Sequence, residues 1–333
     1  MNSKLKSVLQ YLLLLLLTGS LLWLSLRSLQ VGEGESKSEF LWNAWEKSNK
    51  GYLALMALAL MISHVFRAER WRMLLQPTNN HISFSGSFLS LLIGYLVNLV
   101  VPRGGEISRC YNLYKLEKTP IEVSFGTVVV ERIIDVICMM TLIAISFFAE
   151  WNKLKAFIDS LEFASGTGMS ISPWTLVILL GVGGVVLVIF MLRKNEKFKK
   201  IVSGFKQGVL AVFQVKKPGL FIFYSIAIWV LYFFMSYWVL KAFDETQNLG
   251  FSAVLTLFAI GSIAMAVPLP GGAGSYHTLV PMGLVALYNL PKADAIAFVF
   301  ILHGWQTLIA IIGGVVSLII SYWIIRWRKA HEK

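Results

Sequence analysis

Long apolar runs alternate with short polar stretches along the chain. Eight apolar segments can be marked, over residues 8–29, 51–66, 84–101, 120–149, 173–192, 219–242, 251–291 with an interruption, and 294–325. Most are about 17 to 30 residues long, and a helix needs roughly 20 residues to cross the core of a bilayer. The pattern predicts an all-α polytopic membrane protein in which residues 8–29 form the first transmembrane helix rather than a cleaved signal peptide.

Composition excludes a soluble domain, and the placement of charge gives an orientation. Of the 333 residues, 56% are hydrophobic and 14% charged, too little polar surface to cover a soluble fold. The net charge is +12, but eight of the 30 basic residues lie within 193–218. The positive-inside rule places this stretch, the C-terminal tail, the N-terminus and Arg67, Arg70 and Arg72 in the cytoplasm. We therefore expect two cytoplasmic termini and no nucleic-acid partner.

Two segments do not fit as simple spans. Arg72 is predicted to lie on the cytoplasmic side. The helix over 120–149 must run outward, because the acidic loop that follows it, residues 150–172, is predicted outside. Residues 84–118 must therefore return to the cytoplasmic side, from which they entered. Their second arm carries six charged residues between Arg103 and Lys118, which favours a re-entrant hairpin. Segment 251–291 enters from the outside and must likewise return to the outside, either as a re-entrant hairpin or as two short spans. The prediction is six full spans plus two re-entrant hairpins.

The two hairpins look like copies of one another. Ile93-Gly94 lies ten residues ahead of Gly104-Gly105, the spacing that separates Ile260-Gly261 from Gly271-Gly272. A shift of 167 residues carries the apolar segments of residues 1–166 onto those of residues 167–333. The whole chain, 1–333, is then a single transmembrane domain of two half-repeats with three spans and one hairpin each. An odd number of spans inverts the second half, an architecture common among transporters.

The first turn combines features that attract anions. A helix that begins near Glu106 directs unpaired amides toward the turn, and nearby arginines can fork onto phosphate oxygens. The candidate residues for binding a lipid headgroup are Asn98, Arg103, Gly104, Gly105, Glu106 and Arg109. The alternative, that these residues only cap and staple the hairpin, is equally compatible with the sequence.

The helix after the first hairpin carries charges near mid-bilayer. Glu131, Arg132 and Asp135 lie about 15 Å from the cytoplasmic start of that helix, at 1.5 Å per residue. Arg132 and Asp135 can pair at i, i+3, whereas Glu131 and Asp135 repel unless a cation or proton comes between them. Together with His303 in the last segment, they are candidates for the translocation path; a structural buried network is the alternative.

The second turn is a candidate outer gate. It is rich in glycine and proline, and its predicted gate residues are Pro270, Gly271, Gly272, Gly274 and His277. With no His-x-x-x-His pair or paired carboxylates beside His303, we expect no metal, and the two cysteines form no disulfide framework. The basic stretch 193–218 has apolar residues at helical spacing and is typical of an amphipathic helix on anionic headgroups, or of a plain positive-inside loop.

These positions resemble a known family. The asparagine at 98, the Pro-x-x-Gly-Glu-x-x-Arg run from Pro102 to Arg109, the Glu-Arg-x-x-Asp run from Glu131 and the Pro-Gly-Gly-x-Gly run from Pro270 are similar to motifs of the flippase-like transmembrane domain of the lysylphosphatidylglycerol synthase family. The likeness covers nearly the whole chain and implies lipid translocation through paired re-entrant helices. His277 stands where that family often has an acidic residue.

The sequence thus predicts a translocase that moves an anionic phospholipid or lipid-linked intermediate between leaflets of a bacterial cytoplasmic membrane. Few residues follow Ile325, so we do not expect lipid aminoacylation. The sequence shows no constellation of nucleophile and base or of metal ligands, so we expect neither an enzyme nor a cofactor. An ion-coupled transporter of a small soluble solute is the main alternative, and a membrane-embedded lipid enzyme is the third. The expected partners are the bilayer and an anionic lipid, and the pattern is also compatible with a homo-oligomer.

Overall fold

The computed structural model describes residues 20, 23, 25–27, 29, 36–160, 196–266, 269 and 273–331, and all regular structure in them is helical. The α-helices are α2 (Lys37–Lys47), α3 (Lys50–Leu75), α4 (Phe84–Asn98), α5 (Gly105–Glu117), α6 (Ile121–Ala149), α7 (Trp151–Ser160), α9 (Glu196–Leu210), α10 (Pro218–Lys241), α11 (Phe251–Ala266), α12 (Ser275–Tyr288) and α13 (Lys292–His331). Short 3-10 turns follow α3 and α9, as η1 (Gln76–Thr78) and η3 (Ala211–Gln214). Nearly all of the predicted span 8–29, the span 173–192, and Pro270, Gly271 and Gly272 lie outside the described residues.

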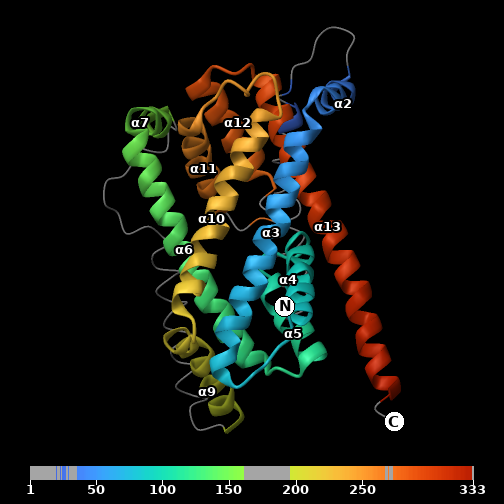
Figure 1. Cartoon of the computed structure of the whole chain (residues 1–333). Helices are drawn as coiled ribbons and strands as arrows, with labels where there is room; N and C mark the ends of the chain where they lie inside the picture. The colour runs from blue at the N-terminus through green and yellow to red at the C-terminus, as the bar shows by residue number, and fades with distance from the viewer. Residues whose placement is uncertain are drawn as a thin grey trace, which may run out of the picture.

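Long helices run the height of the molecule. Among the residues that the structure describes, three segments are long and apolar enough to cross a membrane, over Lys50–Thr78, Pro218–Lys241 and Lys292–Arg328. With 29 residues, α6 is about 44 Å long. In Figure 1, α3 and α13 descend while α6 and α10 ascend. The all-helical membrane class is confirmed, and the count of six full spans stays a prediction.

Two pairs of shorter helices occupy opposite halves of the molecule. The 15 residues of α4 and the 16 of α11 correspond to about 22 and 24 Å, less than the roughly 30 Å of a bilayer core. The α4 and α5 pair lies in the lower half of Figure 1, and the α11 and α12 pair lies in the upper half. Each pair starts and ends at one end of the molecule, as the predicted hairpins do; their position in a bilayer stays a prediction.

Close backbone contact fixes the first pair. A Cβ added to Gly105 would lie 2.1 Å from the carbonyl oxygen of Gly94, so this crossing requires glycine. The Asn98 side chain accepts a hydrogen bond of 2.7 Å from the Gly105 amide, which satisfies one of the free amides at the start of α5. Arg103 has a φ of 59°, in the left-handed region that reverses the chain.

The second pair is tied in a similar way. The Ser275 hydroxyl at the start of α12 donates a hydrogen bond of 2.7 Å to the Ala264 carbonyl near the end of α11. Gly274, with a φ of 91°, precedes this helix and adopts a backbone conformation that strongly favours glycine. Gly261 faces the Tyr276 ring, where an added Cβ would lie 3.0 Å from the ring. Small residues therefore allow close packing in both pairs.

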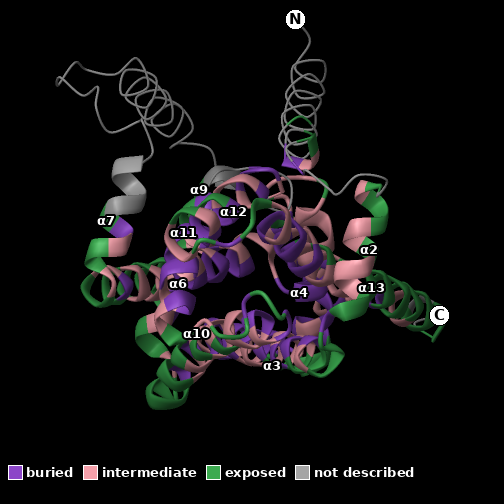
Figure 2. Cartoon of the chain, turned by 90° about the horizontal axis from the view of Figure 1, so that it is seen from above, coloured by how far each residue is buried: buried purple, intermediate pink, exposed green. Residues whose placement is uncertain are grey.

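The basic helix α9 packs directly against α6. A Cβ on Gly208 would lie 2.3 Å from the Val123 carbonyl oxygen, and one on Gly126 would lie 2.4 Å from the Phe205 carbonyl oxygen. One face of α9 is thus held by protein, while Ile201 and other residues stay exposed. Viewed from above, buried residues gather toward the centre and the outer length of α13 is exposed (Figure 2), as expected for a surface that meets lipid.

Candidate functional site

Six charged side chains from three helices meet inside the lower half of the bundle. We call them the arginine–carboxylate cluster: Arg67 and Arg70 of α3, Arg109 of α5, and Glu131, Arg132 and Asp135 of α6. Helical spacing aligns them, because residues three or four apart share a face. The hairpin helix α5 supplies one member, so the cluster joins the first helix pair to two of the long helices.

Asp135 is the centre of one half of the cluster. Its two carboxylate oxygens lie 2.8 Å from the Arg67 Nη1 and 2.8 Å from the Arg70 Nη2, and Arg132 Nη2 approaches at 3.3 Å. The predicted pairing of Arg132 with Asp135 is confirmed. Arg67 also donates a hydrogen bond of 2.8 Å to the Tyr232 hydroxyl, which brings α10 into contact with the cluster.

Glu131 is the centre of the other half. It is fully buried and lies 2.6 Å from Arg109 Nη2 and 3.6 Å from Arg70 Nε. The Arg109 guanidinium lies over the Trp71 ring at 4.7 Å, and the Trp71 indole donates a hydrogen bond of 2.9 Å to Thr127. Arg70 therefore reaches both carboxylates, and this cation relieves the repulsion that the sequence predicts between Glu131 and Asp135.

The cluster carries more positive than negative charge. Four arginines meet two carboxylates, a formal excess of 4 − 2 = +2. Five of the six side chains are at most 10% exposed, but the Arg132 side chain is 41% exposed. Buried charge of one sign is costly unless an opposite charge meets it. The excess therefore favours an anion at the accessible Arg132 edge.

Several buried polar atoms of α4, α5 and α6 have no hydrogen-bond partner. They are Arg109 Nε, Arg132 Nε and the Tyr95 hydroxyl, which can donate, and Glu106 Oε2, which can accept. The Tyr95 ring belongs to α4 and packs at a tilt against His64 of α3, with ring centroids 4.5 Å apart. Unpaired buried donors are uncommon in folded proteins. The unpaired donors of the cluster, Arg109 Nε and Arg132 Nε, are suited to an anion.

The predicted headgroup residues do not all belong to the cluster. Arg109 joins it and is already paired with Glu131, whereas Arg103 is exposed at the turn between α4 and α5. Asn98 and Gly105 fasten the turn, and Gly104 precedes the first residue of α5. Asn98, Gly104 and Gly105 therefore shape the turn between α4 and α5. The headgroup role of Arg103 stays a prediction.

The predicted gate and path histidines meet in the upper half. His277 and His303 have ring centroids 4.8 Å apart, and Tyr276 stacks on His303 at 5.7 Å. The His277 Nδ1 is buried without a hydrogen-bond partner. His303 is thus a neighbour of His277 rather than a member of the arginine–carboxylate cluster. Among the described residues, no group of three or more His, Cys, Asp or Glu could hold a metal.

The sequence interpretation missed Arg67 and Arg70. It treated them as cytoplasmic charges that follow a span ending at residue 66, but α3 continues to Leu75 and buries both guanidinium groups. The available signal was local: no helix breaker separates Arg67 from Leu75, and Arg67, Arg70, Trp71 and Leu74 recur at helical spacing. Arg72 points elsewhere and pairs with Glu69.

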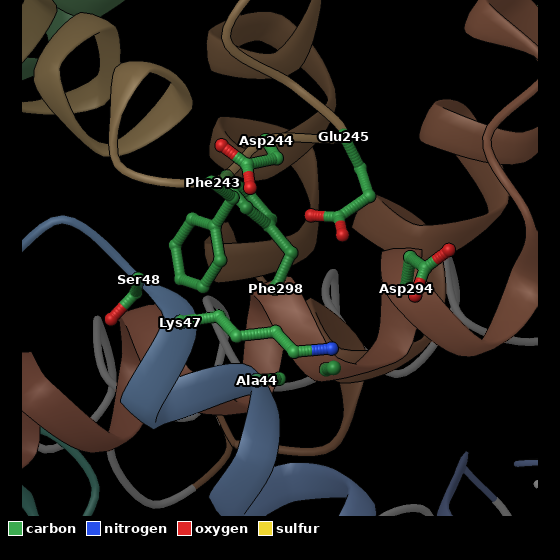
Figure 3. A pocket seen from close by; sticks show the side chains of 9 residues that line it. Ala44, Lys47, Ser48, Phe243, Asp244, Glu245, Asp294 and Phe298 are labelled. Atoms are coloured by element: carbon green, nitrogen blue, oxygen red, sulfur yellow. The ribbon is translucent and has the colours of Figure 1, made fainter.

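A hollow at the upper end is too small to hold a headgroup. It measures about 30 Å³, close to the volume of one water, and is lined by Ala44, Lys47, Ser48, Phe243, Asp244, Glu245, Asp294, Ala297 and Phe298. In Figure 3 the Lys47 side chain extends toward Asp294 beneath Glu245. Acidic residues line this end, whereas α9 at the other end is rich in lysine. The orientation in the membrane stays a prediction.

The Glu150 carboxylate, at the C-terminus of α6, lies 2.9 Å from Lys153. Burial alone would raise the pKa of Glu150, but hydrogen bonds with Lys153 and Ser252 together outweigh burial and hold this pKa below its usual range. The same hydrogen bond raises the pKa of Lys153. This pair therefore favours the charged forms and stabilises the junction of α6, α7 and α11.

Similar proteins agree with a membrane assignment. The family model described as "Lysylphosphatidylglycerol synthase TM region" matches residues 11–314. UPF0104 membrane protein MJ1595 of Methanocaldococcus jannaschii is 28% identical over 156 residues, which cover 45% of each chain. UPF0104 membrane protein MJ1078 of the same archaeon is 24% identical over 60% of this chain and 81% of its own. No solved structure matches the chain.

The name of a third relative states an activity. Glycosyltransferase AglD of the archaeon Haloferax volcanii is 23% identical over 80% of this chain and 48% of its own length. The chain thus spans about half the length of MJ1595 and of AglD. Because the family model covers most of its length, this integral, multi-pass membrane protein belongs to the lysylphosphatidylglycerol synthase transmembrane family.

Proposed function

We propose that this protein is a lipid translocase that moves an anionic phospholipid or lipid-linked intermediate between the leaflets of the membrane. The headgroup passes along the polar interior while the hydrocarbon chains stay in the bilayer. Arg132 and Arg109 attract the phosphate, and Glu131 and Asp135 hold the arginines in position. In a bacterium the membrane is the cytoplasmic one, and both termini face the cytoplasm.

The arginine–carboxylate cluster carries this proposal. The cluster has an excess of two positive charges, and its Arg132 side chain is 41% exposed, so an anion that reaches this side chain would meet charge that the two carboxylates leave unbalanced. The cluster includes α5 of the first helix pair, where an anionic headgroup would meet the turn fastened by Asn98. Family membership and the lipid chemistry named in the family description support a lipid rather than a soluble substrate.

Two other functions remain as alternatives. An ion-coupled transporter of a small soluble solute would also use buried charges and inverted repeats. The glycosyltransferase named among the relatives raises a lipid-modifying enzyme as the other. We propose that this chain performs no covalent chemistry itself, because its cluster of arginines and paired carboxylates is suited to anion binding. Mass spectrometry of the lipid after incubation separates an enzyme from a translocase.

The decisive test is lipid movement in proteoliposomes. Purified protein is reconstituted with phospholipids or polyprenyl phosphate that carry a fluorescent label, and a membrane-impermeant quencher reports the fraction in the outer leaflet over time. We expect movement faster than in empty liposomes, a slower rate for Arg132→Gln and an unchanged rate for Arg326→Gln, an exposed arginine near the end of α13. Movement no faster than in empty liposomes for every labelled anionic lipid would overturn the proposal.

A further inference from the structure

An apolar groove lies between α2 and α13. Its volume is about 280 Å³, near the lower end of the roughly 300 to 1,000 Å³ of small-molecule sites. It is lined by Trp42 and Trp45 of α2 and by Phe300, Ile301, Gly304, Trp305 and Leu308 of α13. The groove is open along one side, and it belongs to neither the arginine–carboxylate cluster nor the hollow at the upper end.

The indole N–H groups of two of its three tryptophans already have hydrogen-bond partners. The Trp305 indole donates a hydrogen bond of 3.2 Å to the Leu53 carbonyl, and the Trp42 indole donates one of 2.8 Å to Glu46. The rings of Trp45 and Trp305 pack 5.5 Å apart, and Lys50 lies over the Trp45 ring. The Trp42 and Trp305 indoles therefore use their N–H donors on protein acceptors, and the lining of the groove is mainly apolar. Such a lining selects an apolar ligand.

The groove lies along a helix segment that is apolar enough to span a membrane. Gly304 is about 18 Å along α13 from Lys292, at 1.5 Å per residue, inside a segment apolar enough to span a membrane. The short helix α2 has charged residues along its length and packs at the upper end (Figure 1), and tryptophans concentrate at the membrane interface. A bilayer around this segment supplies acyl chains in excess.

Gly304 leaves the groove open. A Cβ added there would meet no atom within 4 Å, and the residue is exposed. Phe300, one turn earlier on α13, packs at 4.5 Å against His277 at the start of α12. The groove is therefore next to the predicted outer gate.

We infer that this groove binds one acyl chain of a membrane phospholipid, held between the Trp42 and Trp45 rings and the Gly304 surface of α13. This assignment is independent of the proposed translocase activity, because it depends on the shape and apolar lining of the groove and on the membrane-spanning segment beside it, and not on lipid movement. The Gly304 gap is the feature that admits the chain, and a larger side chain at this position would fill it without disturbing the backbone.

Photolabelling of the full-length protein tests this inference. The probe is a phosphatidylglycerol with a diazirine in one acyl chain, added to the protein in nanodiscs, and the labelled peptides are located by mass spectrometry. We expect labelling of the α2 and α13 peptides that contain Trp42 and Gly304. Gly304→Leu should reduce this labelling roughly tenfold, the effect of losing about two methylenes of contact.

A matched control keeps the test specific. Gly219→Leu makes the same change at the start of α10, where an added Cβ also meets no atom within 4 Å, and it should leave the labelling unchanged. Three results would overturn the inference: no label on the two peptides, equal labelling of wild type and Gly304→Leu, or an equal loss in Gly219→Leu. Preferential labelling by a polyprenyl phosphate probe would also overturn it, because the occupant would then be an isoprenoid chain.

Discussion

Replacing Asp135 with asparagine should destabilise the protein strongly. The change leaves the shape of the side chain but removes the charge that meets Arg67 and Arg70 at 2.8 Å each. These two guanidinium groups are 6% and 0% exposed, so neither can gain water in compensation. The formal excess of the cluster rises from +2 to +3. Removing one partner of a buried ion pair costs about 3 to 5 kcal/mol, and we expect a loss in this range for Asp135→Asn.

The assay is denaturant unfolding of purified protein in a fixed detergent, with the midpoint and slope compared between variants. Arg132→Gln is the matched control, because its side chain is 41% exposed and should contribute less than about 1 kcal/mol. Adding Arg67→Met to Asp135→Asn should recover part of the loss, because fewer unpaired charges then stay buried. An unchanged midpoint for Asp135→Asn would refute the view that these charges stabilise one another.

Three further changes test other parts of the structure. Gly208→Leu should separate α9 from α6, because the new Cβ would lie 2.3 Å from a carbonyl oxygen; limited proteolysis should then cut α9 faster than in Gly219→Leu. Asn98→Ala should cost about 1 kcal/mol through the lost hydrogen bond to the Gly105 amide, and Asn98→Asp should recover most of it in thermal unfolding. The pKa of Glu150 is lowered, so its contribution is complete above the usual value of 4.5 and is lost as the pH falls through the lowered value; Glu150→Gln should remove this part of the pH dependence of stability.

Each of these outcomes has a contrary result. Equal proteolysis of the Gly208→Leu and Gly219→Leu variants would show that α9 does not depend on the close crossing with α6. Asn98→Ala with wild-type thermal stability would contradict a capping role. An unchanged pH profile in Glu150→Gln would exclude this carboxylate as the titrating group.

Local patterns predicted most of the helices. Apolar runs end where polar residues or glycine and proline occur, so segments such as 219–242 and 120–149 closely match α10 and α6. The spacing of glycines likewise predicted two turns of similar construction, and the Asn98 motif coincides with the hydrogen bond that fastens the first of them. Hydrophobic runs and glycine spacing are short-range properties, so each can be recognised within a single segment of the chain.

The end of α3 shows where local patterns fail. A charged residue after an apolar run is normally a span boundary, which is why Arg67 was placed in the cytoplasm. Its charge is instead met by Asp135, 68 residues later in the chain. A pairing over this distance depends on how α3 packs against α6, and no pattern within α3 reports it.

The sequence by itself thus determined the membrane class, the helices and the candidate charges of α6, because hydrophobicity and helical period are local. Only the tertiary structure decided that Arg67 and Arg70 join those charges, that His303 meets His277, and that Arg109 is already paired. The physical reason is that a buried charge is stable only beside its counter-charge, and packing between distant helices chooses that partner.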